Sequence, residues 1–306
     1  MKRLAFLSVF VLISLLSFNA FAQQNKANTA PVPRKFKALF IGNSFTFCQG
    51  GVNNLVAAMV NTAPGYKMIG AASTQGGYNL AQHSDPEDPI KTVAKIKSQK
   101  WNVIVLQDHS IFAIAQRDAM IEGGCAIHKL ILEHSPATQV VLYETWARGP
   151  YMLEGFGEDE QKKTEMIQFY NEKFGLRTRC APVLDWLKDG IHGGYAQLKE
   201  AIDKQADEFN AKPENKIKAP HTIVVPAGSY WELSKKANPD INLYYTDNYH
   251  QSAAGNYLTG LIFYKTLTGQ NKISGMYKRL AAKRIKVGIS AQDAAKLEKI
   301  AEETLE

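Results

Sequence analysis

Apolar residues recur along the chain in two different spacings. Several short runs, rich in β-branched residues, end in Gly, Asn, Ser or Asp. The longer stretches between them place apolar residues three or four positions apart, which is the spacing of an amphipathic helix. The expected strands are 37–41, 67–72, 102–106, 139–143 and 222–226. The expected helices are 52–60, 89–99, 119–134, 253–267 and 291–305.

The alternation of strands and helices predicts an α/β domain. Strands with a continuous apolar run, such as 102–106 after its first residue, are buried on both faces. Strands that are joined through helices pair in parallel by right-handed crossovers. Sheets of this kind place their sites at the carboxyl ends of the strands. We therefore expect a parallel sheet whose functional residues follow the strands.

One segment is longer than a crossover between strands requires. Residues 144–220 separate the fourth and fifth expected strands, and helical spacing occurs near 158–175, 180–188 and 195–211. We expect a helical insertion beside the site. A packed extension with no part in the site is the alternative.

The first 22 residues have the pattern of a secretory signal peptide. Lys2 and Arg3 precede an apolar run from 4 to 18, and small residues at 20 and 22 form a cleavage site. The run is short for a membrane span, although an uncleaved anchor helix is the alternative. We expect cleavage after Ala22, a secreted or periplasmic protein, and no stable membrane insertion afterwards.

The rest of the chain reads as one domain. Residues 23–35 are polar with two prolines and predict a flexible lead-in, so a single domain is expected over 36–306. The formal net charge of +7 comes from basic residues that are scattered among acidic ones. This pattern indicates a solvated surface and argues against nucleic-acid binding.

Metal, nucleotide and redox signatures are missing from the sequence. The three cysteines, Cys48, Cys125 and Cys180, have no C-x-x-C spacing and allow at most one disulfide. No phosphate loop, dinucleotide fingerprint or zinc-ligand spacing occurs. We expect no metal and no cofactor.

The sharpest local signal is the turn Gly42-Asn43-Ser44 at the end of the first expected strand. A serine at this place exposes its hydroxyl, and backbone N–H groups at a helix start can stabilise a developing oxyanion. A serine that only caps the helix is the alternative.

A second signal is Asp247-x-x-His250, just before the long helix 253–267. A serine nucleophile needs an imidazole base, and the base needs a carboxylate that fixes its tautomer. One loop that holds both residues could supply both needs. A capping or surface histidine is the alternative.

Together these motifs resemble the first and last blocks of the GDSL/SGNH hydrolase superfamily, and Gly77-Tyr78-Asn79 resembles its second block. The resemblance runs in scattered blocks from 39 to 267. It implies an α/β, three-layer, flavodoxin-like fold with a central parallel sheet of about five strands. It also implies that Ser44 is the nucleophile, His250 the general base and acid, and Asp247 the orienting carboxylate. The N–H groups of Ser44 and Gly77 would form part of the oxyanion hole.

The third block departs from the superfamily pattern. Gly-x-Asn-Asp is usual, and its Asn side chain donates to the oxyanion, whereas this chain has Leu106-Gln107-Asp108-His109. This version resembles a secreted bacterial branch with Gln at that position. Gln107 has the same amide chemistry and is expected to be the third oxyanion donor. Loss of one such donor costs about 10²- to 10³-fold in rate.

Other side chains near the strand ends are candidates for substrate contact. Polar loop residues and aromatic residues serve structural roles equally well. The candidates are Asn43, Asn79, His83, His109 and Trp146. His192 and His221 have no partner that the sequence identifies.

The resemblance implies a secreted serine esterase that acts on a small-molecule or glycan ester and deacylates, in particular deacetylates, carbohydrate. Two alternatives stay open. One is a glycan-binding protein that has lost useful catalysis, and the other is an acyltransferase.

Overall fold

The computed structural model describes residues 32–148 and 191–305. The predicted signal peptide, the helical stretches 158–175 and 180–188, and Cys180 lie outside the described residues. Of the other two cysteines, Cys48 and Cys125 are both free. The first strand begins at Lys35, the last residue of the predicted lead-in.

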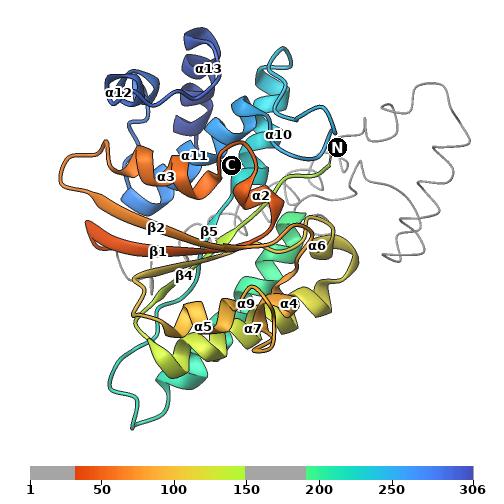
Figure 1. Ribbon diagram of the computed structural model, residues 1–306, viewed down its shortest axis with the longest axis vertical. Helices are drawn as coiled ribbons and strands as arrows, with labels where there is room; N and C mark the ends of the chain where they lie inside the picture. Colours follow the sequence, from red (N-terminus) through yellow and green to blue (C-terminus); the bar gives the residue numbers. More distant parts are fainter. Residues whose placement is uncertain (1–31, 149–190, 306) are drawn as a thin grey trace, which may run out of the picture.

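Five parallel strands form one sheet with the order β2-β1-β3-β4-β5, which is the flavodoxin-like order (Figure 1). This confirms the predicted fold class. The strands are β1 (Lys35–Gly42), β2 (Lys67–Thr74), β3 (Val103–Leu106), β4 (Gln139–Tyr143) and β5 (Ile223–Val225). Their registers pair Gly42 with Thr74 and Ile41 with Leu106, so β1, β2 and β3 end at the same edge of the sheet.

Side chains alternate between two hydrophobic layers, one on each face of the sheet. In β1, Ala38 and Phe40 belong to one buried cluster, and Leu39 and Ile41 belong to the other. The strands β3 and β4 are buried at every position. The continuous apolar runs of the sequence are thus explained by burial on both faces.

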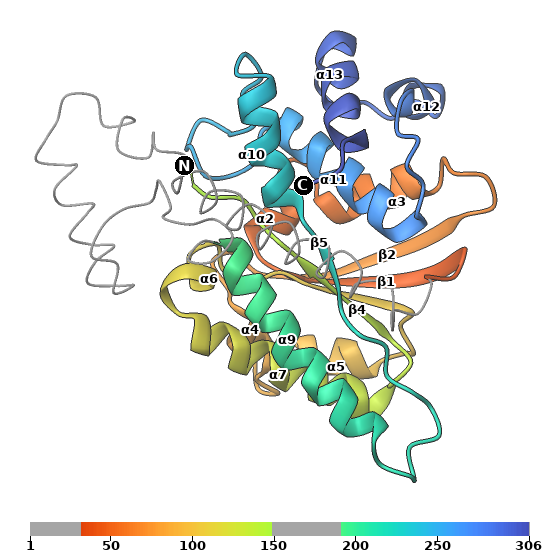
Figure 2. The same cartoon turned by 180° about the vertical axis from the view of Figure 1, so that it is seen from behind.

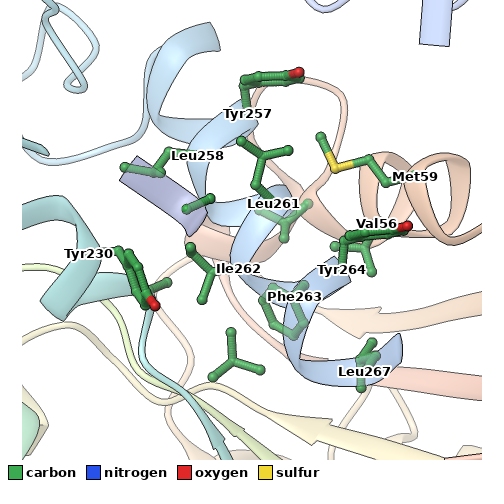
Figure 3. Close-up of a cluster of buried hydrophobic side chains, with 14 of the residues drawn as sticks. Val56, Met59, Tyr230, Tyr257, Leu258, Leu261, Ile262, Phe263, Tyr264 and Leu267 are labelled. Atoms are coloured by element: carbon green, nitrogen blue, oxygen red, sulfur yellow. The ribbon is translucent and has the colours of Figure 1, made fainter. Parts of the chain in front are cut away.

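Helices cover both faces, and the two opposite views show the same arrangement (Figures 1 and 2). One layer holds α3 (Val52–Val60), α10 (Ala227–Ala237), α11 (Ala253–Thr268), α12 (Met276–Ala282) and α13 (Ala291–Glu302). The central helix of this layer is α11, which is buried almost all round. Figure 3 shows its side chains Leu261 and Tyr264 near Val56 and Met59 of α3.

The other layer holds the shorter connections and two long helices. They are α4 (Leu80–Ser84), α5 (Thr92–Lys97), α6 (Phe112–Ala115), α7 (Arg117–His134) and α9 (Ile191–Asn210). Since α9 leads into β5 and packs on α7, it is the crossover helix between β4 and β5 (Figure 2). The residues 191–210 of the segment predicted as an insertion therefore belong to the fold's own helical layer.

Among the helices of residues 32–148 and 191–305, none combines the length and the apolar content that crossing a bilayer requires.

Candidate active site

Ser44 lies where β1 ends and a single helical turn begins. Asn43 is the N-cap of that turn, α2 (Ser44–Phe47), and its side-chain oxygen accepts a hydrogen bond from the Phe45 N–H at 3.1 Å. Ser44 is half-buried, and its own N–H donates to none of the described residues. The Ser44 hydroxyl and the Ser44 N–H, which has no acceptor among the described residues, therefore both lie at the carboxyl end of β1.

Asp247 and His250 lie on one tight loop just before α11. The Tyr245 N–H donates to the His250 carbonyl at 2.8 Å, and the Asn248 N–H donates to the Tyr245 carbonyl at 3.0 Å. Asn248 adopts a left-handed conformation with φ 60°, which asparagine tolerates better than most residues. The loop thus closes on itself and carries both side chains toward β1.

Ser44, His250 and Asp247 form a continuous chain of hydrogen bonds. His250 Nε2 lies 2.6 Å from Ser44 Oγ, and His250 Nδ1 lies 2.7 Å from Asp247 Oδ2. Because the carboxylate accepts, Nδ1 carries the proton and Nε2 is free to accept from the serine hydroxyl. This is the geometry of a serine nucleophile with its base and orienting acid.

Asp247 is held in its charged form. Its Oδ1 accepts from the N–H groups of His250 at 2.9 Å and Tyr249 at 3.1 Å. Burial acts to raise the pKa of Asp247, but the hydrogen bonds from His250 and Tyr249 outweigh it and hold the pKa below its usual value. The carboxylate is therefore fixed in both charge and orientation.

Aromatic rings that the motifs did not identify hold the His250 ring. Tyr249 packs 4.0 Å from it and Phe45 packs 5.5 Å from it, measured between ring centroids. The Arg148 guanidinium lies 4.7 Å from the centroid of the Tyr249 ring, within cation–π range. In the sequence, the aromatic residues directly beside Ser44 and His250, at positions 45 and 249, could have indicated this packing.

A second turn, which carries Gly77, lies beside the Ser44 turn. The Gln75 N–H donates to the Gly42 carbonyl at 3.2 Å, and Asn43 Nδ2 donates to the Tyr78 carbonyl at 2.8 Å. Gly77 has φ 73°, is exposed, and its N–H donates to none of the described residues. Two uncommitted backbone N–H groups, those of Ser44 and Gly77, thus belong to two turns that are bonded to each other.

Gln107 is not where the expected oxyanion donor should be. Its side chain is fully buried, and both amide hydrogens are used: Nε2 donates to Asn43 Oδ1 at 3.0 Å and to the Asp108 carbonyl. Its Oε1 accepts from the Asn43 N–H at 2.9 Å and the Thr46 hydroxyl at 3.0 Å. Gln107 therefore stabilises the Ser44 turn through hydrogen bonds to Asn43 and Thr46. Its amide hydrogens are not available to an oxyanion, so the prediction that it is an oxyanion donor is corrected.

His83 is also internal rather than part of a substrate surface. It is fully buried, with Nε2 2.9 Å from the Gly42 carbonyl and Nδ1 2.8 Å from the Thr92 hydroxyl. Since a carbonyl only accepts, Nε2 carries the proton and the ring is neutral, and burial lowers the pKa of His83 accordingly. His83 supports the turn that carries Ser44.

The remaining candidates divide into buried and partly exposed residues. Trp146 is fully buried and stacks on Trp231 with 3.8 Å between ring centroids, and its indole N–H donates to the Tyr249 carbonyl at 2.9 Å. Asn43 is buried with its amide engaged, as described above. These two are therefore structural, whereas Asn79 and His109 are partly exposed at the same edge of the sheet.

His192 has a partner that the sequence did not reveal. Its Nδ1 lies 2.6 Å from Oε2 of Glu144, a fully buried carboxylate whose other oxygen accepts from the Ser229 N–H at 2.8 Å. Burial acts to lower the pKa of His192, but Glu144 outweighs it and the pKa is raised. In the described part of the chain, no group of three or more His, Cys, Asp or Glu residues could hold a metal ion.

Solved structures are similar to this chain in fold, whereas comparisons of sequence alone find no match. No protein-family model matches, and no curated protein matches significantly. A DUF4886 family protein from Bacteroides uniformis is 17% identical with a TM-score of 0.54, over 88% of this chain and 93% of that protein.

Two further structures are less similar. A protein from Slackia heliotrinireducens that is assigned to the SGNH hydrolases is 17% identical with a TM-score of 0.48, over 76% of this chain and 99% of that one. A protein from Parabacteroides merdae that is assigned as a GDSL-like lipase is 15% identical with a TM-score of 0.48, over 78% and 99%. With its five-stranded parallel sheet and two helical layers, this chain has a flavodoxin-like fold, and the DUF4886 family protein is similar to it in fold.

Proposed function

We propose that this protein is a serine esterase that hydrolyses carboxylic esters through an acyl-enzyme. The observation that carries the proposal is the continuous chain from Ser44 Oγ through His250 to Asp247, with contacts of 2.6 and 2.7 Å. Three residues from two distant segments reach hydrogen-bonding distance in the order that nucleophilic catalysis requires.

The first half of the reaction follows from the proton positions. His250 Nε2 accepts the Ser44 proton while Ser44 Oγ attacks the ester carbonyl carbon. Asp247 stabilises the imidazolium that forms, because its charge faces Nδ1. His250 then gives its proton to the leaving alcohol, and the acyl group stays on Ser44. In the second half, His250 takes a proton from water while the water oxygen attacks the acyl carbonyl carbon. His250 then returns that proton to Ser44 Oγ as the acyl–Oγ bond breaks and the carboxylic acid leaves.

The uncommitted N–H groups of Ser44 and Gly77 are the proposed donors to the oxyanion. They are backbone groups on two turns that Asn43 bonds together, so they need no reorganisation when the charge develops. Gln107 contributes indirectly, because it holds the Asn43 N–H from below.

We propose an acylated, in particular O-acetylated, carbohydrate as the substrate of the secreted protein. Exposed aromatic rings near the serine support this choice. Phe47, on the same turn as Ser44, is 43% exposed, and Tyr245, whose N–H bonds the His250 carbonyl, is 49% exposed. Aromatic rings with one open face suit the apolar faces of sugar rings. Trp146, the aromatic residue expected from the sequence, is buried and does not support it.

A glycan-binding protein with weak catalysis is a second candidate, because Gln107 has no amide hydrogen left for an oxyanion. Among the described residues, the proposed donors are then the backbone N–H groups of Ser44 and Gly77, and one donor fewer costs about 10²- to 10³-fold in rate. Glycan binding that is unchanged in Ser44→Ala, together with no turnover in the wild type, would favour this candidate.

The test compares the wild type with Ser44→Ala on p-nitrophenyl acetate and on acetylated polysaccharides. Ser98→Ala is the matched control, since Ser98 is exposed and, among the described contacts, its hydroxyl donates to the Lys95 carbonyl and does not contact Ser44. We expect acetate release by the wild type and by Ser98→Ala, and none by Ser44→Ala. Cleavage of lipid esters without any acetate release from polysaccharide would overturn the carbohydrate proposal but keep the esterase.

A further inference from the structure

Asp108 is a buried carboxyl group at the end of β3 that the proposed chemistry does not use. Its side chain is fully buried beside the Ser44 turn. Oδ1 accepts from the N–H groups of Leu80 at 3.0 Å and His109 at 2.6 Å. Within the described residues, Oδ2 has no hydrogen-bond partner. All the described hydrogen bonds of the carboxyl group therefore go to Oδ1, which links the segment at Leu80 to the segment at His109.

The bond to Leu80 fixes one end of the turn that carries Gly77. Leu80 is the first residue of α4, and Asn79 caps that helix by accepting from the Gln82 N–H at 2.9 Å. The other end of the turn is fixed where the Gln75 N–H meets the Gly42 carbonyl at 3.2 Å. The exposed Gly77 lies between these two anchors, and only the anchor at Leu80 depends on Asp108.

A close helix contact leaves α4 little freedom to shift. Gly123 of α7 is so near α4 that an added Cβ would lie 2.3 Å from the Ala81 nitrogen. The backbone of α4 is thus in close contact with α7, and the N–H of its first residue is bonded to Asp108. Loss of the Asp108 bond would free the Leu80 N–H, at the point where the Gly77 turn joins α4, while the rest of α4 stays against α7.

A buried carboxyl oxygen without a hydrogen-bond partner lowers the stability of the fold. An apolar side chain would fill the same space without this loss, so packing alone does not explain an aspartate at position 108. Burial raises the pKa of Asp108 to about 7, although the bonds from His109 and Leu80 oppose this. The Asp108 N–H donates to the Tyr195 hydroxyl at 3.2 Å, which holds the backbone of the residue in place. The whole residue is therefore immobilised with Oδ1 aimed at α4.

We propose that Asp108 is a positioning residue of the oxyanion hole, whose Oδ1 holds the turn 75–80 so that the Gly77 N–H faces the carbonyl that Ser44 attacks. This inference rests on the proposed esterase function. Because Asp108 touches neither Ser44 nor His250 in the described contacts, it acts through Gly77.

The experiment compares Asp108→Asn with Asp108→Ala. Asparagine keeps an acceptor oxygen for the Leu80 and His109 N–H groups, whereas alanine removes it. We expect Asp108→Asn to keep kcat within about 3-fold of the wild type, and Asp108→Ala to lower kcat by about 100-fold with little change in KM. A boronic acid that forms a tetrahedral adduct with Ser44 should lose affinity for Asp108→Ala in parallel with kcat.

Glu298→Ala is the matched control for loss of a buried carboxylate. Glu298 is 5% exposed and accepts from the Gly275 and Tyr277 N–H groups at 2.7 Å, far along the chain from the site. We expect it to lower stability while kcat per folded molecule stays unchanged. Rates are normalised to the folded fraction, which is measured by intrinsic fluorescence.

The possible outcomes distinguish a failure of the role proposed for Asp108 from a failure of the proposed esterase function. Equal kcat and equal boronic acid affinity in Asp108→Ala and the wild type would overturn the role of Asp108 while leaving the esterase intact. A loss of kcat in Asp108→Asn as large as in Asp108→Ala would also overturn it, because the acceptor would then not be what matters. A wild type with no turnover and no boronic acid adduct would instead overturn the proposed function on which the inference rests.

Discussion

A methyl group at Gly42 should disrupt the turn that carries Ser44. A Cβ on Gly42 would lie 2.4 Å from Gln107 Oε1, 3.0 Å from Gln107 Cβ and 2.9 Å from Thr46 Oγ1. Rotation of the Gln107 amide alone cannot relieve this, because its Cβ is also too close. The whole side chain must move, and the Asn43 N–H and the Thr46 hydroxyl then lose their acceptor.

The size of the effect follows from these contacts. Each buried donor left without a partner costs about 1–3 kcal/mol, and overpacking a core adds about 1–3 kcal/mol. We expect Gly42→Ala to lower the free energy of unfolding by on the order of 4 kcal/mol, a large part of the roughly 5–15 kcal/mol typical of a domain. Turnover should fall as well, because Ser44 follows this turn directly.

Gly70→Ala is the control, since Gly70 pairs with Ala38 in the neighbouring strand and its added Cβ would meet only ordinary contacts of 3.6 and 3.7 Å. Urea denaturation followed by tryptophan fluorescence measures both variants, and ester hydrolysis gives kcat. We expect the free energy of unfolding of Gly70→Ala to lie within about 1 kcal/mol of that of the wild type. Gly42→Ala with stability and kcat equal to those of Gly70→Ala would refute the claim that Gln107 braces the turn.

Three further results are expected. Asp247→Asn should lower kcat by about 10³- to 10⁴-fold in steady-state assays, because Nδ1 of His250 loses the charge that fixes its tautomer. Burial raises the pKa of Asp108 from 3.8 to about 7, so the unfolded chain binds fewer protons between these values. Wild-type stability should therefore fall, relative to Asp108→Asn, by about 4 kcal/mol from pH 4 to 8 in urea titrations. Glu298→Ala should cost about 2–4 kcal/mol by the same measurement, since it leaves the Tyr257 hydroxyl and two N–H groups without an acceptor.

The sheet could be predicted from the sequence because its strands are apolar on both sides. The run 103–106 has no polar face, and only burial between two helical layers allows that. The short helix α4 was missed, because five residues are too few to show a helical period. The role of 191–210 was also missed, since spacing identifies a helix but does not show that it packs on α7.

The candidate site could be predicted in part for a similar reason. Ser44 follows a strand, and the carboxyl edge of a parallel sheet is where functional loops gather, so the turn itself indicated chemistry. The direction of Gln107, His83 and Trp146 could not be predicted. Polar and aromatic side chains at strand ends point outward or inward according to tertiary packing, and here all three point inward. Gln107 and His83 bond to the turn that carries Ser44, and Trp146 bonds to the loop of His250, so none of the three faces solvent.

The most direct test of the proposed mechanism is to trap the acyl-enzyme. Wild type and Ser44→Ala are mixed with p-nitrophenyl acetate, quenched in acid within the first turnover, digested and analysed by mass spectrometry. The mechanism predicts one acetyl group on the wild-type peptide that contains Ser44, a matching burst of p-nitrophenolate, and neither signal in Ser44→Ala. Acetylation at another residue, or equal turnover in both proteins, would contradict the assignment of Ser44 as the nucleophile.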